Sequence, residues 1–231
     1  MSQYTEEEQI ETLKHFWDDY GNALLSLLLL AAIAFAGWRF WQRHEDQVAL
    51  EAATRYQHVL MDAQAAQQAQ GSQAKAANTL FQSDASQLLQ ATPDSGYAAL
   101  TRLLLARAAI DHGDLTEADR QLSQLLTHRP EAMLAAVARL RLAQVKLAEH
   151  QVQDALAVLA EVKDPAFAAS VLELRGDAYQ QLNQTDAARQ AYLQAKDRLQ
   201  AAHQPARPLL DMKMADLGVA PAPADAGAIA Q

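Results

Sequence analysis

The segment from Asn22 to Trp41 limits the fold of this chain more than any other feature of its sequence. No residue from Gly21 to Trp38 carries a charge, and the first half of the segment is rich in leucine. A helix of about twenty residues is about 30 Å long, which matches the hydrocarbon thickness of a bilayer. The sequence therefore predicts one transmembrane helix over residues 21–42.

Aromatic and basic side chains lie at the ends of this segment, where rings and long cations favour the headgroup layer of a membrane. The predicted interface anchors are Trp17, Tyr20, Trp38, Arg39, Trp41 and Arg43. Small residues four apart inside the segment favour close packing against another transmembrane helix, although an alanine-rich face toward lipid has the same spacing. The candidate packing residues are Ala32, Ile33, Ala36 and Gly37.

Two other interpretations compete with a retained membrane anchor. A buried core helix is usually shorter and has a polar face. A cleaved signal peptide is the closer alternative, because Ala34-Phe35-Ala36 has the form of a cleavage site. Signal peptides begin with a basic region, however, and residues 1–20 carry six acids against the single base Lys14. We therefore expect a retained anchor, preceded by a short acidic leader at residues 1–20.

The basic residues around the segment give a weak indication of orientation. Lys14 precedes it, whereas Arg39, Arg43 and Arg55 follow it. The positive-inside rule then places the large domain in the cytoplasm, but the bias is small and large domains translocate largely regardless of charge.

The composition of the 231 residues favours helices and excludes several kinds of site. Half of the residues are hydrophobic, alanine supplies much of that half, and aromatic residues make up only 6%; such composition favours closely packed helices over sheets. The net charge is −9, and the leader contributes −5 of it (six acids minus one base). The remainder has no basic stripe, which argues against nucleic-acid binding. The absence of cysteine excludes disulfides and thiolate metal sites.

A helical hairpin next to the membrane is predicted over residues 43–96. Neither proline nor glycine occurs between Trp41 and Gly71, so the membrane helix can continue to Gln70. Gly71 is expected to stop it and Ser72 to cap a second helix. That second helix is predicted from Ala74 to Gln90, before a turn at residues 92–96.

Three helical pairs with a period near 34 residues follow over residues 97–204, as in tetratricopeptide repeats. Small residues recur at equivalent positions: Ala106, Ala143 and Gly176 in the first helix of each pair, and Ala118, Ala155 and Ala188 in the second. They allow the two helices to approach closely. Gly113, His150 and Asn183 occupy the turns, where we expect positive φ. A generic alanine-rich bundle is the alternative.

The end of the chain is predicted as a capping helix over residues 205–217 and a disordered Ala/Pro-rich tail over residues 218–231. Leu210, Met214 and Leu217 form the apolar face of this helix and are expected to cover the last repeat. The predicted fold class is thus all-α: a single N-terminal transmembrane helix followed by a tetratricopeptide-like α-solenoid of helical hairpins.

No motif in the sequence supports an enzyme. The seven histidines include no pair at i, i+3 or i+4, so no helix face offers paired metal ligands. The chain has no P-loop, no G-x-G-x-x-G and no G-x-S-x-G. We predict no catalytic residue, no metal site and no cofactor.

Binding of a peptide is better supported. In a tetratricopeptide solenoid, the first helices of the pairs line a concave surface. The candidate groove residues are Leu103, Arg107, Ile110, Asp111, Leu140, Gln144, Leu147, Glu173, Asp177 and Gln180. Their mixture of apolar and polar side chains suits an adaptable peptide groove, although each residue alone is more typical of a solvated helix position than of a binding hot spot.

An ordered set of short motifs resembles the YfgM-type ancillary subunits of the bacterial SecYEG translocon. The motifs extend from residue 3 to about residue 217 and include Tyr4-Thr5-Glu6-Glu7-Glu8-Gln9, Phe16-Trp17, Gly37-Trp38-x-x-Trp41, Tyr97-Ala98-Ala99-Leu100, Gly113-Asp114-x-x-x-Ala118, Arg139-Leu140-Arg141-Leu142-Ala143 and Gly176-Asp177-x-Tyr179. Each motif is weak alone, but their order is specific.

The resemblance implies a single-pass protein of the bacterial inner membrane, with a cytoplasmic N-terminus and a periplasmic C-terminal domain. It thereby outweighs the small excess of arginine after the apolar segment. It also implies two partners, namely the SecYEG translocon and a membrane-anchored periplasmic chaperone of the prolyl-isomerase type.

The expected function is a non-enzymatic, membrane-anchored interaction module that links the translocon to periplasmic chaperones for secreted clients. Two alternatives remain open at this point. One is a regulatory adaptor whose acidic leader contacts a stress-response regulator, and the other is a structural scaffold that self-associates through its repeats.

Overall fold

The computed structural model describes residues 4–219, and it describes side chains for residues 25–27, 29–42 and 47–219. All regular structure in this part of the chain is helical, as the sequence predicts. The chain divides into two compact units between Glu51 and Ala52. The disorder predicted for residues 218–231 falls mainly on residues 220–231, which lie outside the described residues.

The elements follow one another along the chain with short connections. They are α1 (Tyr4–Gln68), α2 (Ser72–Ala91), α3 (Gly96–Asp111), α4 (Leu115–Thr127), α5 (Ala132–Ala148), α6 (Val152–Ala160), the 3₁₀ helix η1 (Pro165–Phe167), α7 (Ala168–Gln181), α8 (Thr185–Ala201) and α9 (Pro208–Asp216).

The first unit is the N-terminal part of α1 and contains the apolar segment. By length and composition, one stretch within Leu25–Gln68 can cross a membrane, and none of its apolar window is buried. Leucine, phenylalanine and tryptophan side chains there are exposed, including Leu29, Phe35 and Trp41. A core helix of a soluble domain would bury such residues, so this exposure argues against that alternative.

The second unit begins with a hairpin of residues 52–68 and α2. Val59 and Ala63 pack against Phe81 and Leu88, which lie on one face of α2. The connection differs slightly from the prediction, because α1 ends at Gln68 and α2 already begins at Ser72. Gly71, with φ of 60°, is the N-cap and no side chain caps the helix, so the prediction that Ser72 is the cap was wrong.

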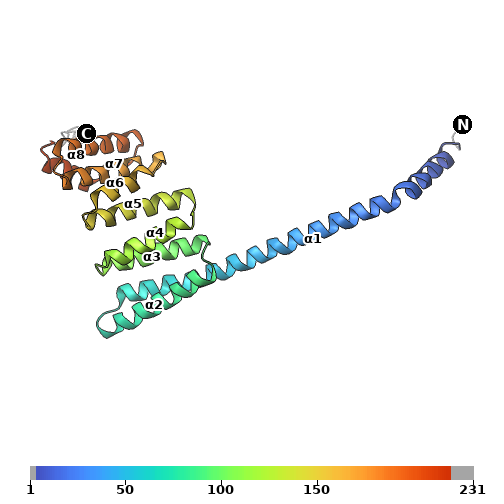
Figure 1. The fold of residues 1–231 in the computed structure, drawn as a ribbon, viewed down its shortest axis with the longest axis horizontal. Helices are drawn as coiled ribbons and strands as arrows, with labels where there is room; N and C mark the ends of the chain where they lie inside the picture. Colours follow the sequence, from blue (N-terminus) through green and yellow to red (C-terminus); the bar gives the residue numbers. More distant parts are fainter. Residues whose placement is uncertain (1–3, 220–231) are drawn as a thin grey trace, which may run out of the picture. The chain divides into compact units, whose positions relative to one another are not determined.

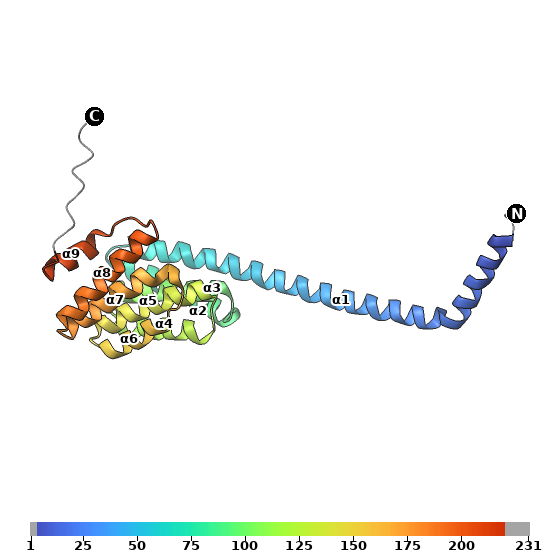
Figure 2. The same cartoon turned by 90° about the horizontal axis from the view of Figure 1, so that it is seen from above.

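Helices α3 to α8 form three further antiparallel hairpins stacked side by side in the second unit (Figure 1). Each helix packs against the next, and the first helices also contact one another, α3 with α5 and α5 with α7. This is the arrangement expected for tetratricopeptide-like pairs. At the end of the stack, α9 packs against α8 (Figure 2).

The turns inside the three pairs have one common geometry. Gly113, His150 and Asn183 have φ values of 78°, 60° and 58°, which confirms the predicted left-handed turn residues. The residue after each turn donates a hydrogen bond five positions back: Asp114 N to Ala109 O, Gln151 N to Lys146 O and Gln184 N to Tyr179 O, at 2.8, 2.8 and 2.9 Å. These bonds satisfy carbonyls at the end of each first helix, as in a Schellman motif.

The small residues lie where the paired helices meet. Ala118, Ala155 and Ala188 are fully buried. In the first two pairs, Ala106 and Ala143 share a core cluster with Leu122 and Leu159 respectively.

The third pair uses a different combination at the same contact. Gly176 replaces the alanine, Tyr192 replaces the leucine, and the tyrosine ring lies directly over the glycine. The larger ring therefore fits because the facing residue has no side chain.

Candidate binding groove

A groove runs between α5 and α7 on the side where first helices of neighbouring pairs meet. It consists of two cavities of about 430 and about 350 Å³. Gln144, Leu174 and Asp177 line both cavities, so the two are parts of one surface. We call this surface the α5–α7 groove.

The structure brings six of the ten predicted groove residues together here. They are Leu140, Gln144, Leu147, Glu173, Asp177 and Gln180. Leu147 is mostly buried in the core below, whereas Gln144 and Gln180 are exposed. Amide side chains both donate and accept hydrogen bonds, so these two glutamines suit the backbone of an extended peptide.

The four predicted residues on α3 line neither of these cavities. Leu103 packs against the core between α3, α4 and α5. The Arg107 Nε donates to both carboxylate oxygens of Asp111, at 3.0 and 2.9 Å, and both side chains are exposed. Ile110 is exposed. This part of the predicted row is a helix surface whose charges already pair with each other.

The C-terminal segment forms one wall of the groove and holds its carboxylates. Lys213 Nζ donates to Glu173 Oε1 at 3.0 Å and to Asp177 Oδ2 at 2.9 Å. Arg207 Nη1 donates to Glu173 Oε2 at 3.1 Å and to Ser170 Oγ at 3.2 Å. The negative charges of Glu173 and Asp177 are thus balanced by basic residues of the same chain.

Sequence reasoning treated these two carboxylates as free groove residues and missed Arg207 and Lys213. Net charge gave no signal for this pairing, because residues 205–217 carry two bases and two acids, and residues 168–201 carry four of each. The opposite wall is apolar in part, since Val137, Leu140 and Phe167 line the same cavity. Leu209 adds an exposed apolar side chain from α9 itself.

Tyr192 connects this ionic cluster to the core of the last pair. Its ring is fully buried, and its hydroxyl donates to Asp177 Oδ1 at 2.7 Å. Burial raises the pKa of Tyr192, and the hydrogen bond to Asp177 raises it further. Burial alone lowers the pKa of Lys213, but hydrogen bonds and the negative charges of Asp177 and Glu173 outweigh it, so this pKa is raised.

These shifts predict that the fold loses stability in alkali. With raised pKa values, folded Tyr192 and Lys213 keep protons that the unfolded chain releases, so stability is complete below about pH 10 and falls above it. Each group contributes a slope of about 1.4 kcal/mol per pH unit between its unfolded and folded pKa. Tyr192→Phe should reduce the pH dependence of the free energy of unfolding by the contribution of one proton. Urea unfolding measured from about pH 8 to about pH 11 tests this.

The loss of the Tyr192 hydrogen bond is measured separately by comparing the two proteins near neutral pH. If the free energy of unfolding falls with pH equally steeply in alkali for the wild type and Tyr192→Phe, the raised pKa of Tyr192 in the folded state is contradicted.

Comparison with known proteins places this architecture in a family. Residues 14–219 match the family described as the tetratricopeptide repeat-like domain. An ancillary SecYEG translocon subunit of Escherichia coli is 32% identical over 187 residues, which covers 81% of this chain and 85% of the relative. The chain belongs to the ancillary SecYEG translocon subunit family.

Other relatives with the same name match over similar or longer ranges. The protein of Haemophilus influenzae is 29% identical over 191 residues, covering 83% of this chain and 88% of its own length. That of Neisseria gonorrhoeae is 29% identical over 218 residues, covering 94% of this chain and 100% of its own length. No solved protein structure matches the chain.

In this member of the ancillary SecYEG translocon subunit family, the matched range includes the apolar segment as well as the repeats. The candidate helix-packing residues Ala32, Ile33, Ala36 and Gly37 are all exposed on α1. The predicted anchors Trp38, Arg39 and Trp41 are exposed too. The side chains of Trp17, Tyr20 and Arg43 lie outside the described residues.

Proposed function

We propose that this chain is a non-enzymatic, membrane-anchored interaction module that associates with the SecYEG translocon of the bacterial inner membrane. One observation carries the proposal: an exposed apolar helix and a stack of tetratricopeptide-like hairpins occur in one chain. The relatives, which are named as ancillary SecYEG translocon subunits, support the choice of partner.

In this proposal the N-terminus is cytoplasmic, and the repeats are periplasmic and recruit a membrane-anchored prolyl-isomerase-type chaperone. The α5–α7 groove is the candidate chaperone or client site, because it combines exposed amides with an apolar wall. Anchoring raises the local concentration of the groove near polypeptides that emerge from the translocon. A modest affinity of the groove for its ligand is therefore sufficient.

The chain contains no cysteine, so single-cysteine variants allow topology and contacts to be tested in the same protein. Gln144→Cys lies in the groove, and Gln153→Cys on α6 is an exposed control that lines neither cavity. Both positions should react with a membrane-impermeant maleimide in cells whose inner membrane is intact. Reaction only after inner-membrane lysis would place the repeats in the cytoplasm and contradict the proposal.

The same cysteines carry a photoreactive benzophenone to identify contacts in native membranes. Gln144→Cys should capture a periplasmic chaperone that the Gln153→Cys control does not capture. In the apolar segment, Ala32→Cys should crosslink to SecYEG more strongly than Ala31→Cys, which lies about 100° from Ala32 around the helix and opposite the middle of the candidate packing face. Equal yields from both members of each pair would argue against these faces as the binding sites.

A further inference from the structure

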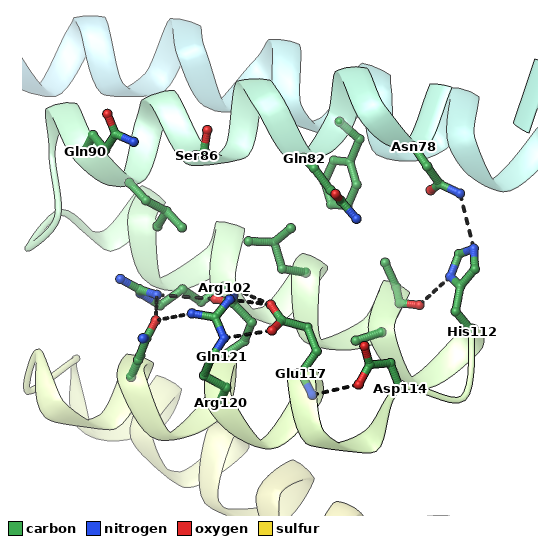
Figure 3. Close-up of a pocket in the computed structure, with 16 residues that line it drawn as sticks. Asn78, Gln82, Ser86, Gln90, Arg102, His112, Asp114, Glu117, Arg120 and Gln121 are labelled. Atoms are coloured by element: carbon green, nitrogen blue, oxygen red, sulfur yellow. Dashed lines mark hydrogen bonds and ion pairs between the residues drawn. The ribbon is translucent and has the colours of Figure 1, made fainter. Parts of the chain in front are cut away.

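A second groove lies between α2 and α4, with α3 as its floor (Figure 3). Its cavity has a volume of about 800 Å³ and shares no residue with the α5–α7 groove. All the residues that line it belong to the second unit. We call it the α2–α4 groove.

The α2 wall presents a row of neutral polar side chains. Asn78, Gln82, Ser86 and Gln90 follow one another at intervals of four residues and all line the cavity. The row extends over thirteen residues, and the twelve steps between its ends correspond to about 18 Å of helix. An extended chain of five or six residues has about the same length. Asn78 Nδ2 lies 3.2 Å from His112 Nε2 and Ser86 Oγ donates to Ser83 O, so these two side chains offer acceptor oxygens. The Gln82 and Gln90 amides can pair with both the N–H and the C=O groups of such a chain.

The floor of the groove contains a buried cation. Arg102 of α3 is only 9% exposed. Its Nη1 donates to two neutral acceptors, Gln124 Oε1 at 2.6 Å and Gln121 Oε1 at 3.3 Å, while its Nε is buried without a partner. Among the described contacts of Arg102 there is no carboxylate.

The two acids that line the α2–α4 groove together with Arg102 are engaged elsewhere. Glu117 pairs with Arg120 at 2.6 Å, and Asp114 caps α4 by accepting a hydrogen bond from Glu117 N. The pKa of Arg102 is lowered by burial and by repulsion from Arg120. A buried guanidinium without an opposite charge destabilises the free protein, and a carboxylate from outside would compensate it.

We propose that the α2–α4 groove binds an extended polypeptide segment and that Arg102 pairs with the side-chain carboxylate of an acidic residue in it. The guanidinium is a planar fork that matches a carboxylate, and the neutral row on α2 matches the backbone on either side. The inference goes beyond the proposed function and does not depend on it.

A side chain fits this site better than the end of a chain. Arg102 also lines a second cavity of about 240 Å³, formed by the turn from Pro93 to Gly96 and by residues 128–131. Arg102 therefore borders both cavities, and we expect a bound segment to extend from the α2–α4 groove toward the second one. A chain that ended at Arg102 would leave this second cavity unfilled.

Three fluorescent peptides test the proposal on the full chain in lipid nanodiscs. The first is acetyl-Ala-Ser-Ala-Glu-Ala-Ser-Ala-amide, the second has glutamine in place of glutamate, and the third has the glutamine and a free C-terminal carboxylate. Fluorescence anisotropy should detect binding of the first peptide at least about tenfold tighter than of the other two. No binding, equal binding of all three, or preference for the free carboxylate would overturn the proposal.

Variants of the protein separate recognition from a structural role. Arg102→Met should weaken binding of the glutamate peptide at least about tenfold, while the thermal midpoint stays equal or rises because an uncompensated buried charge is removed. Arg107→Met is the matched control, since Arg107 lies on the same helix outside the groove. It should leave peptide binding unchanged.

A strongly lowered midpoint for Arg102→Met would overturn the view that its charge is uncompensated. In that case Gln82→Ala/Gln90→Ala, at two exposed positions of the α2 wall, still tests the groove. This double variant should keep the wild-type midpoint and bind the glutamate peptide more weakly. Unchanged binding would exclude the α2–α4 groove as the site.

Discussion

Gly176→Ala is expected to destabilise the fold by about 2 kcal/mol, although alanine normally strengthens a helix interior by about 1 kcal/mol over glycine. A Cβ at this position would meet the Tyr192 ring, with the ring Cζ only 2.8 Å away. The ring cannot move aside easily, because it is fully buried and its hydroxyl is bonded to Asp177 and Gln180. The measurement is urea unfolding followed by circular dichroism in detergent micelles.

Gly96→Ala is the control for Gly176→Ala, because a Cβ there meets nothing within 4 Å. It should change stability by no more than about 0.5 kcal/mol. The combined variant Gly176→Ala/Tyr192→Leu recreates the alanine and leucine of the first two pairs. Its loss should be smaller than the sum of the two single losses, with a coupling of about 1 kcal/mol or more. Additive losses would show that the two residues do not depend on each other.

The same contact explains why the repeats were predictable from the sequence. Small residues at spacings of 37 and 33 are required wherever two helices pack closely, and the turn residues recur in step with them. The small residues and the turn residues both lie within a single helical pair, so their positions in one pair predict the equivalent positions in the next. The left-handed geometry of His150 and Asn183 followed from their place in this register.

The binding surfaces were less predictable, because they depend on which distant residues the fold brings together. Glu173 and Asp177 look like solvated acids in the sequence, and only the docking of α9 provides Lys213 to pair with them. Arg102 has the sequence context of an ordinary helical arginine, and its burial depends on the packing of α2, α3 and α4. No periodic pattern in the sequence indicates the ion pairs of these carboxylates or the burial of Arg102.

Leu210→Ala/Met214→Ala is expected to cost about 4 kcal/mol or more and to release α9 from the last pair. Leu210 and Met214 are 1% and 2% exposed and belong to the same core cluster as Tyr192 and Leu199. Truncating one buried leucine or methionine to alanine typically costs 2–5 kcal/mol, depending on how far the site collapses, so about 4 kcal/mol is the lower end for two. The free energy of unfolding in urea measures the loss.

The same helix supplies a control of identical composition. Leu209 and Met212 are 59% and 64% exposed, so Leu209→Ala/Met212→Ala should change stability by less than about 1 kcal/mol. Hydrogen exchange should show faster exchange of the α9 amides only in the buried pair. Because Lys213 and Arg207 would move away with α9, Glu173 and Asp177 would then face the α5–α7 groove without these cations. Similar losses in both variants would mean that α9 does not hold the groove in its neutral state.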